Sequence, residues 1–327
     1  MTILFNRSVQ LDIFANNQRV TLAKPGTRPG IDSVFFEFDI TVSRDKEPNR
    51  ARISVYNLGP TNRNLFEADH QGVELSAGYD GEVKLLFRGV TTNVTQDKQK
   101  TFYKTTFYCG DGEKEYGTQK FNKSYSKNTK IELILNDMAK ALGLPKEIIF
   151  LEKAATLLKG RSFSGLCKDA LTELTKDYKL QWSIQQGVLE VTPIGSPIIS
   201  QPFAVLLSTD TGMIGSPRLI ERQKKEDKDE KKKKKKKQKK KDDGKPKDRI
   251  VGVRVVSLIN PDIYPNRLIK IVPQRTQTET LGKLMEAKTP EVSGEGVWLV
   301  DKARFFGDNR TGPFHVEAEA DIMKQVF

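Results

Sequence analysis

The segments LLSTDTGMIGSPRLIE (Leu206–Glu221) and GVRVVSLINPDIYPNRLIKI (Gly252–Ile271) decide the fold of this chain. Each is typical of a strand, a tight turn and a second strand, and Asn260-Pro261-Asp262 supplies turn formers in the second segment. Between the two segments lies QKKEDKDEKKKKKKKQKKKDDGKPKD, which has no apolar side chain to bury. The sequence therefore predicts a β-domain that is interrupted by a solvated, lysine-rich loop and then resumes.

The positive charge of the chain is concentrated in this loop. The sequence has 55 Lys and Arg against 42 Asp and Glu, a net charge of +13. Residues Arg222–Arg249 contain 17 basic and 7 acidic residues, so the loop contributes +10 and the remainder of the chain +3. A nucleic-acid-binding domain usually spreads basic residues over a folded face. The distribution therefore favours a solvated spacer, with a polyanion contact as the alternative.

The lysines available for a polyanion contact lie together in the middle of the loop. They are Lys231, Lys232, Lys233, Lys234, Lys235, Lys236, Lys237, Lys239, Lys240 and Lys241.

Residues 1–123 predict a small β-barrel or β-sandwich. Ser33–Ser43 alternates apolar and polar residues, which is the period of a half-buried strand. A short helix is expected to begin at Pro60, because proline suits the first turn of a helix. Further strands are expected at Arg52–Leu58, Gly72–Tyr79, Val83–Val90 and Thr101–Cys109.

Residues 124–195 predict a compact α+β module. Apolar residues recur at helical spacing from Ile131 to Leu142, and Thr129 with Glu132 indicates a capping box at the start of that helix. Gly143 is expected to end the helix.

The rest of this module is expected to be one more helix and a hairpin. The helix covers about Gly165–Tyr178, and the hairpin turns at Gln186-Gly187. Trp182, in the first strand of the hairpin, is expected in the core.

Residues 196–327 predict a second β-rich region. Its cleanest strand is Phe314–Asp321, where apolar and polar residues alternate. The other expected strands are Phe203–Leu207, Val251–Ile259, Arg267–Val272 and Val297–Phe305.

Motifs of enzymes and metal sites are absent from the sequence. His70 and His315 are far apart, and Cys109 and Cys167 show no metal-ligand spacing, so both cysteines are expected to be buried. The sequence lacks HExxH, Walker, GxSxG and CxxC motifs. A cation at Gly307-Asp308-Asn309 would need a second acidic cluster. We therefore expect a non-enzymatic protein that holds no cofactor and no metal, and no apolar run is long enough to span a membrane.

Five segments resemble, in order, the baseplate hub proteins of contractile-tailed bacteriophages, of the late control D-like and Mu types. They are YNLGPTNRNLF (Tyr56–Phe66), ELSAGYDGEVKLLFRGVTT (Glu74–Thr92), TGMIGSP (Thr211–Pro217), SLINPDIYPNRLIKI (Ser257–Ile271) and VDKARFFGDNRTGPF (Val300–Phe314). The lysine-rich loop departs from the pattern expected of these hubs.

The resemblance implies a fold and an assembly. Such hubs are homotrimers, and each subunit carries two barrel domains similar to the tail-tube protein, so that three subunits imitate a six-fold ring. The resemblance therefore implies a mainly β chain with two tail-tube-like β-barrel domains at 1–123 and 196–327, an α+β module at 124–195, and the loop at 222–249 inside the second barrel.

The resemblance also implies a structural role. The hub adapts the hexameric tail tube to a trimeric spike and lines the central channel. Its partners would be other copies of itself, the tail-tube protein, the spike protein, other baseplate proteins and DNA in transit. It would be assembled in the host cytoplasm and reside in the virion, in the tail baseplate.

Two alternatives from other classes remain open. A nucleic-acid-binding protein would act through the lysine-rich loop, and its affinity would fall steeply with salt. A tail-associated cell-wall hydrolase would need a catalytic carboxylate in a cleft.

Overall fold

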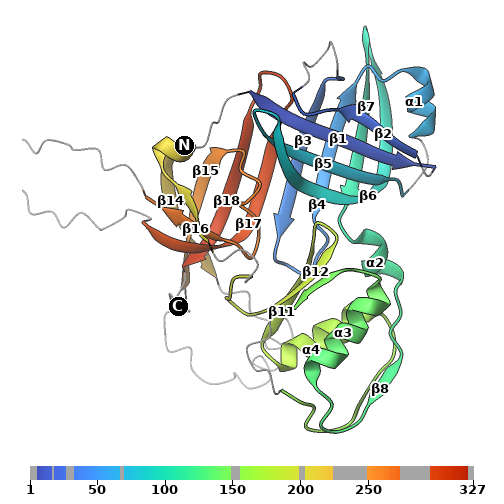
Figure 1. Ribbon diagram of the computed structural model, residues 1–327, viewed down its shortest axis with the longest axis vertical. Helices are drawn as coiled ribbons and strands as arrows, with labels where there is room; N and C mark the ends of the chain where they lie inside the picture. The colour runs from blue at the N-terminus through green and yellow to red at the C-terminus, as the bar shows by residue number, and fades with distance from the viewer. Residues whose placement is uncertain are drawn as a thin grey trace, which may run out of the picture.

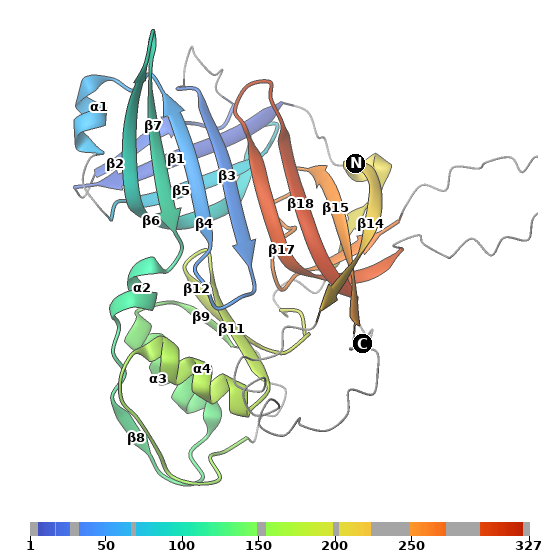
Figure 2. The same ribbon diagram turned by 180° about the vertical axis from the view of Figure 1, so that it is seen from behind.

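A computed structural model describes residues 6–16, 18–26, 33–66, 70–148, 155–198, 203–223, 249–272 and 295–322. The described chain is mostly β-structure, arranged as one large sheet with a smaller α+β module attached to one end (Figure 1). The N-terminal half of the sheet and its C-terminal half lie side by side, and the module lies below both (Figure 2).

The strands that belong to the large sheet come from both ends of the sequence. They are β1 (Arg7–Ala15), β2 (Gln18–Ala23), β3 (Phe36–Ser43), β4 (Arg50–Tyr56), β5 (Gly72–Tyr79), β6 (Glu82–Gln99), β7 (Phe102–Gly110), β13 (Val205–Leu207), β14 (Met213–Gln223), β15 (Arg249–Leu258), β16 (Leu268–Ile271), β17 (Gly296–Asp308) and β18 (Phe314–Ile322).

The remaining elements are helices and short strands, most of them in the module. They are α1 (Pro60–Leu65), α2 (Glu113–Thr118), β8 (Lys123–Tyr125), α3 (Ile131–Leu142), β9 (Lys146–Ile148), β10 (Arg161–Phe163), α4 (Cys167–Asp177), β11 (Leu180–Gln185), β12 (Val188–Pro193) and the 3-10 helix η1 (Thr209–Thr211).

The thirteen strands of the large sheet form one continuous hydrogen-bonded surface. Their order is β14-β15-β18-β17-β3-β4-β7-β6-β5-β1-β2, and β16 joins β17 to β13. The two β-rich regions meet where Lys302–Asp308 of β17 pairs antiparallel with Glu37–Ser43 of β3.

The described ranges do not confirm the expectation of two separate barrels. The second region continues the sheet of the first, and the described ranges contain no closed barrel. The physical reason is that the outer edge of β3 would otherwise present unpaired backbone N–H and C=O groups, which β17 satisfies.

The two halves of the sheet repeat one pattern of pairing. The order β3-β4-β7-β6-β5 in the first half matches β14-β15-β18-β17-β16 in the second. Each half has a bulge at the corresponding place, between Thr91 and Asn93 in β6 and between Val300 and Lys302 in β17.

Backbone details at the start of β5 and β16 also repeat. The amide of His70 donates to the carbonyl of Thr91 at 3.2 Å, and the amide of Asn266 donates to the carbonyl of Val300 at 3.0 Å. Both residues have a left-handed backbone, with φ of 60° at His70 and 62° at Asn266. Two non-glycine residues thus accept the same unusual conformation at matching positions.

One face of the large sheet forms the core. The core residues come from both halves, among them Phe36, Ile40 and Phe107 of the first and Phe305 and Val316 of the second, and all five are essentially inaccessible to solvent. The alternation in Ser33–Ser43 and Phe314–Asp321 is confirmed, because the apolar side chains of β3 and β18 are buried and the alternate ones are not.

The middle module has a core of its own. Its helices α3 and α4 pack on the three-stranded sheet β11-β12-β9, and the predicted stripe from Ile131 to Leu142 is buried. Gly143 ends α3 with φ of 72°, as expected. The predicted capping box is wrong, because Lys130 is the N-cap residue and the hydroxyl of Thr129 donates to the carbonyl of Ser126 instead.

The hairpin of the module is confirmed. Gln186 and Gly187 have φ of 53° and 78°, which suits a two-residue turn with two left-handed residues. Trp182 is buried, and its indole N–H donates to Thr172 Oγ1 at 3.2 Å. Cys109 and Cys167 are both buried and free, as expected.

Candidate functional site

The sheet presents a continuous polar face on the side opposite its core. We call the outward side chains of β15, β18, β17, β3, β4, β7 and the second half of β6 the polar face. Cross-strand register places them in rows, because residues directly opposite each other in a sheet point to the same side. One row runs through His315, Phe306, Asp39, Arg52 and Tyr108.

The strongest contact of the polar face lies at the junction of the two halves. Arg304 on β17 donates its Nε and Nη2 hydrogens to the two carboxylate oxygens of Asp39 on β3, each at 2.8 Å. Arg52 on β4 approaches the same carboxylate at 3.6 Å. The hydrogen bonds from Arg304 hold the pKa of Asp39 below its usual value of 3.8, against the opposing effect of its partial burial.

A second set of ion pairs crosses the C-terminal half. Arg254 on β15 lies 2.6 Å from Glu319 and 3.3 Å from Glu317 on β18. Near the end of the junction, Arg44 pairs with Asp301 at 2.6 Å and with Asp321. Charges of opposite sign thus alternate along the face, which limits its net field.

An open depression of about 450 Å³ lies on the polar face over β3, β4 and β7. Asp39, Arg50, Arg52, Tyr108 and Glu113 are among its lining residues. The carboxylate of Asp39 is already held by Arg304 and Arg52, so it is engaged in ion pairs. Among the lining residues that the structure describes, no nucleophile is paired with a general base.

The module is fixed to the sheet by a buried polar network. Asp111, which directly follows β7, accepts hydrogen bonds from the backbone amides of Gln186 at 2.7 Å and Gly187 at 3.1 Å. Asn49 donates to the carbonyl of Ile184 and the side chain of Gln185, and Gln185 in turn donates to the carbonyl of Ser43. The tip of the β11–β12 hairpin is therefore held at the base of β4 and β7.

A second buried contact ties the module to the C-terminal half. Glu190 on β12 accepts hydrogen bonds from Asn266 Nδ2 and from the guanidinium of Arg267, each at 2.9 Å. Glu190 is 2% exposed, so its charge depends on these partners. The module thus contacts both halves of the sheet and braces their junction.

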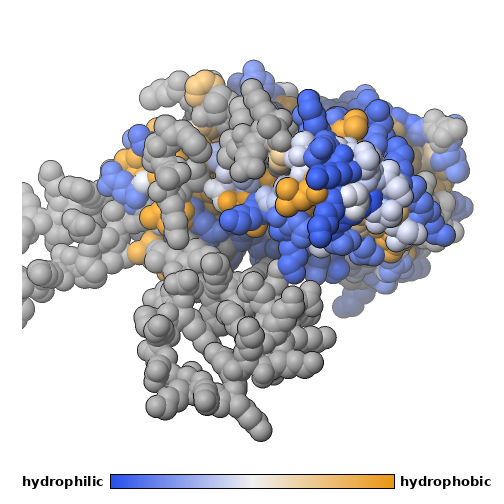
Figure 3. Space-filling model, turned by 90° about the horizontal axis from the view of Figure 1, so that it is seen from below, coloured by the Kyte–Doolittle hydropathy of each residue, from blue (hydrophilic) through white to orange (hydrophobic). Residues whose placement is uncertain are grey.

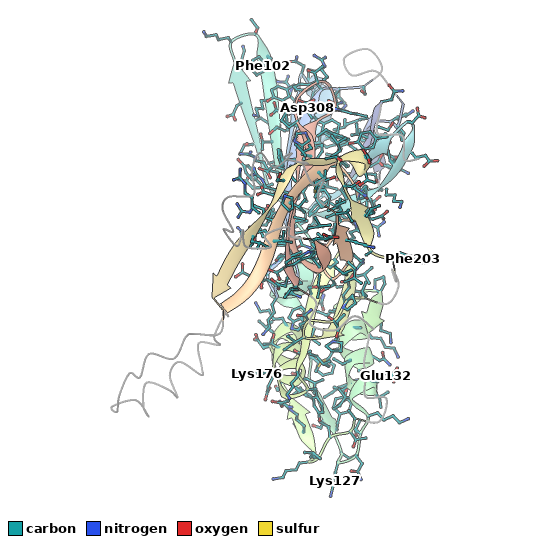
Figure 4. All side chains as sticks on the ribbon, turned by 90° about the vertical axis from the view of Figure 1, so that its left-hand side faces the viewer. Phe102, Lys127, Glu132, Lys176, Phe203 and Asp308 are labelled. Carbon is teal, nitrogen blue, oxygen red and sulfur yellow. The ribbon has the colours of Figure 1, made fainter. Side chains whose placement is uncertain are left out.

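The long hairpin of β6 and β7 projects from the sheet at the end away from the module. Figure 4 shows Phe102, at its tip, and Lys127, in the module, at opposite ends of the molecule. Near this tip the guanidinium of Arg63 lies 3.8 Å from the centre of the Tyr103 ring. On the coloured part of the face in Figure 3, hydrophilic residues predominate and hydrophobic residues form small separate groups.

The residues that the sequence singled out are not brought together into one site. Lys231–Lys237 and Lys239–Lys241 lie outside the described residues. At Gly307-Asp308-Asn309, the Asp308 carboxylate accepts the amides of Arg310 and Gly312 and pairs with Arg7. No group of three or more His, Cys, Asp and Glu that could hold a metal occurs in the described residues. None of the helices in these ranges is long and apolar enough to cross a membrane.

Sequence reasoning missed the polar face as a unit. The alternation in β3 and β18 marks polar residues on one side of each strand, but Asp39 and Arg304 are 265 positions apart. The signal that could have found the pair is the repeat itself, since β3 is the edge strand of one half and residues 302–308 of β17 lie beyond β16 at the edge of the other.

Solved structures share this fold over nearly the whole chain. The tail protein from Neisseria meningitidis MC58 aligns with a TM-score of 0.60 at 10% identity, covering 97% of each chain. The 43 kDa tail protein of prophage MuSo2 from Shewanella oneidensis aligns with a TM-score of 0.56 at 12% identity, covering 96% of this chain and 97% of the other.

A third similar structure belongs to a secretion system. The E. coli c3393 protein, a component of the type VI secretion system with structural similarity to T4 bacteriophage tail proteins gp27 and gp5, aligns with a TM-score of 0.53 at 11% identity. That alignment covers 89% of this chain and 74% of the other. The sequence matches no protein-family model and no curated protein. At these identities the likeness shows the fold, which this chain shares with those tail proteins.

Proposed function

We propose that this protein is a structural baseplate hub of a contractile phage tail, which adapts a hexameric tail tube to a trimeric spike. The observation that carries the proposal is the repeated pairing within one continuous sheet. A chain with two matching halves supplies two matching units to a ring, so three copies supply six. This is the arithmetic that a connection between six-fold and three-fold components requires.

The fold comparisons support the same proposal. One of the similar structures is a tail protein from Neisseria meningitidis, another is a prophage tail protein, and the third is similar to T4 bacteriophage tail proteins gp27 and gp5. The order of the five sequence segments that resemble baseplate hubs is consistent with this fold. The proposed partners are two further copies of the chain, the tail-tube protein, the spike protein and other baseplate proteins, and the proposed location is the tail baseplate of the virion.

The polar face supports a channel-lining role within this proposal. A channel wall for DNA must be hydrated and must not hold the phosphate backbone strongly, because each basic contact adds a salt-dependent attraction. On the polar face, arginines such as Arg304 and Arg254 are neutralised by Asp39, Glu317 and Glu319. We therefore place this face toward the channel.

The proposed mechanism is geometric and non-enzymatic. The module braces the junction of the two halves through Asp111 and Glu190, so that both halves keep a fixed relation within the ring. As part of this proposal, the regions before residue 123 and after residue 196 act as two matching tube-like domains that are joined by the shared sheet.

The test is the place and copy number of the protein in the tail. Light scattering of the purified protein should give about three times the 36.9 kDa of one chain. Electron microscopy of tails that carry a tagged copy should place the tag between tube and spike, with three copies per tail. A protein that is absent from purified tails would refute the proposal.

The two alternatives make different predictions in the same preparations. A nucleic-acid-binding protein would lose DNA binding on deletion of residues 222–249. A cell-wall hydrolase would clear a suspension of purified peptidoglycan. DNA binding that is lost with the loop would favour the first alternative, and hydrolysis of peptidoglycan by the purified protein would favour the second.

A further inference from the structure

The large sheet leaves strand edges without a strand partner in the described part of the chain. One is the outer edge of β14, which pairs only with β15. Another is the second half of β6, beyond Val90, on the side opposite β7. An unpaired edge is a template for a strand of another chain. The repeat within the sheet relates these two edges to each other.

The strands β6 and β17 occupy equivalent places in the two halves. When their bulges are aligned, Thr91 corresponds to Val300. The first halves of the two strands then pair with β5 and β16 in the same register, because Gly89 lies opposite Val73 and its equivalent, Trp298, lies opposite Ile269. The second half of β17, from Lys302 to Asp308, then takes β3 on the same edge as β16. The equivalent segment of β6, residues 93–99, has no such strand within the described ranges.

The strands β14 and β3 are equivalent in the same way. Each is the first strand of the hairpin that flanks its half, paired with β15 or β4. Arg218 in β14 lies opposite Arg254, which lies opposite Glu319. Asp39 in β3 lies opposite Arg52, which in turn lies opposite Tyr108. Arg218 therefore occupies the place of Asp39.

We propose that β14 of one copy of this chain pairs antiparallel with residues 93–99 of β6 in a second copy, and so continues the sheet as β17 and β3 do within one copy. The register of the internal junction carries over to this one. In the internal junction Asp39 lies opposite Phe306, and their equivalents in the proposed contact are Arg218 and Asp97. Likewise Thr41 lies opposite Arg304, and their equivalents are Ile220 and Thr95. The contact joins unlike edges, so it can propagate around a ring. It deepens the proposed function, and it rests on that function only for the closure of the ring at three copies.

Charge and apolar exposure at the two edges agree with this register. Arg218 and Asp97 are both exposed and would face each other as an opposite-charge cross-strand pair. Leu219 occupies the place of Ile40, which is fully buried in the internal junction, yet Leu219 is 40% exposed. A second copy would cover it. The two edges also lie on opposite sides of the molecule in Figure 1, as a head-to-tail contact requires.

Disulfide trapping tests the register directly. The amide of Arg44 donates to the carbonyl of Asp301 at 3.0 Å, so these two residues form a hydrogen-bonded pair. Hydrogen-bonded and non-hydrogen-bonded pairs alternate along an antiparallel ladder, so Thr41 and Arg304 form a non-hydrogen-bonded pair, in which the Cα atoms are closest. The equivalent variant, Thr95→Cys with Ile220→Cys, should form intermolecular disulfides under mild oxidation of the full-length protein. The matched control, Thr95→Cys with Leu219→Cys, should not, because those side chains point to opposite faces. The two native cysteines are buried.

A charge swap tests the same contact in solution. Asp97→Arg or Arg218→Asp alone should weaken self-association by about five- to thirty-fold, since an attractive pair becomes a repulsive one. The double variant should restore it. Lys127→Glu, on an exposed turn of the distant module, should leave self-association unchanged.

The outcomes separate this proposal from the proposed function. Intermolecular disulfides from the matched pair alone, with rescue by the double charge swap, would support the contact between β14 and β6. If the protein is found as a trimer in tails but neither the disulfide nor the rescue is observed, the contact is wrong and the hub proposal stands. If both are observed in a protein that is absent from tails, the contact stands and the hub proposal fails.

Discussion

Arg304 and Asp39 form a two-point ion pair, with both guanidinium hydrogen bonds at 2.8 Å, across the line where the two halves of the sheet meet. Asp39 is 24% exposed and Arg304 47% exposed at the side chain, so solvent screens the pair. Its net contribution to the free energy of unfolding is therefore modest, about 0.5–1 kcal/mol. Its importance is geometric, because a bidentate pair fixes the orientation of two strands from distant parts of the sequence.

We expect Asp39→Asn to lower the melting temperature at neutral pH and to have little effect in acid. The pKa of Asp39 is lowered in the folded state, so its contribution is present above the unfolded value near 3.8 and is lost as the pH falls through the lower folded value. Melting curves of the parent and the variant should therefore differ at pH 7 and converge as the pH falls below the folded pKa of Asp39.

A double-mutant cycle with Arg304→Gln isolates the pair from other acid effects. The coupling between positions 39 and 304 should be measurable at pH 7 and absent in acid. A coupling of the same size at both pH values would show that Asp39 acts through packing and not through its charge.

The sequence predicted the strands of the sheet better than their arrangement. Alternation in β3, β5 and β18 defines strand positions and faces, because side chains on a strand alternate between a buried and an exposed side. The segment from Arg7 to Ala23 was missed, although it forms β1 and β2. The junction of β3 with β17 could not be predicted from alternation, since it joins residues about 265 positions apart and depends on which edges remain unpaired.

We expect Leu135→Ala in α3 to lower the free energy of unfolding by about 2–5 kcal/mol, because Leu135 is fully buried and its removal leaves a cavity. Leu133→Ala on the same helix is the matched control, since Leu133 is 52% exposed and its truncation should change stability by less than about 0.5 kcal/mol. Chemical denaturation measures both variants. Equal effects at the two positions would contradict the burial of the α3 stripe in the core of the module.

We expect Asp111→Ala to loosen the module from the sheet. The substitution leaves the amides of Gln186 and Gly187 without their acceptor in a partly buried place, at a cost of up to about 1–3 kcal/mol for each unsatisfied group. Hydrogen exchange should become faster at the tip of the β11–β12 hairpin, while α3 stays protected. Asp177→Ala removes an exposed ion pair with Arg161 and should leave the exchange of the hairpin unchanged.

The candidate site could be predicted from the sequence only in part. The turn at Gln186-Gly187 was evident from its residue types, but its acceptor, Asp111, lies 75 positions earlier and no pattern in the sequence marks it. Polar residues at a tertiary contact have no periodic signal, because their partners are set by how elements dock. The lysine-rich loop, in contrast, is evident in the sequence; its residues 224–248 lie outside the described ranges, while its two ends belong to β14 and β15.

We expect replacement of residues 224–248 by a short Gly-Ser turn to leave the melting temperature almost unchanged. Gln223 lies directly opposite Arg249 at the end of the β14–β15 pair, so a short turn can join them without moving either strand. Seven consecutive lysines cannot pack closely without solvent or counter-charges, and closing a longer loop costs only a logarithmic increment of entropy. The natural loop should therefore add little to folding stability.

The same variant tests whether Lys231–Lys237 and Lys239–Lys241 contact a polyanion. If they do, the parent protein should bind DNA with an affinity that falls steeply with salt, and the shortened variant should lose that binding while it still self-associates. Assembly of tails with the shortened variant then separates a role in DNA passage from a role in building the baseplate. A large fall in melting temperature of the isolated variant would show that the loop is part of the folded structure, because a solvated loop has no packing contacts to lose.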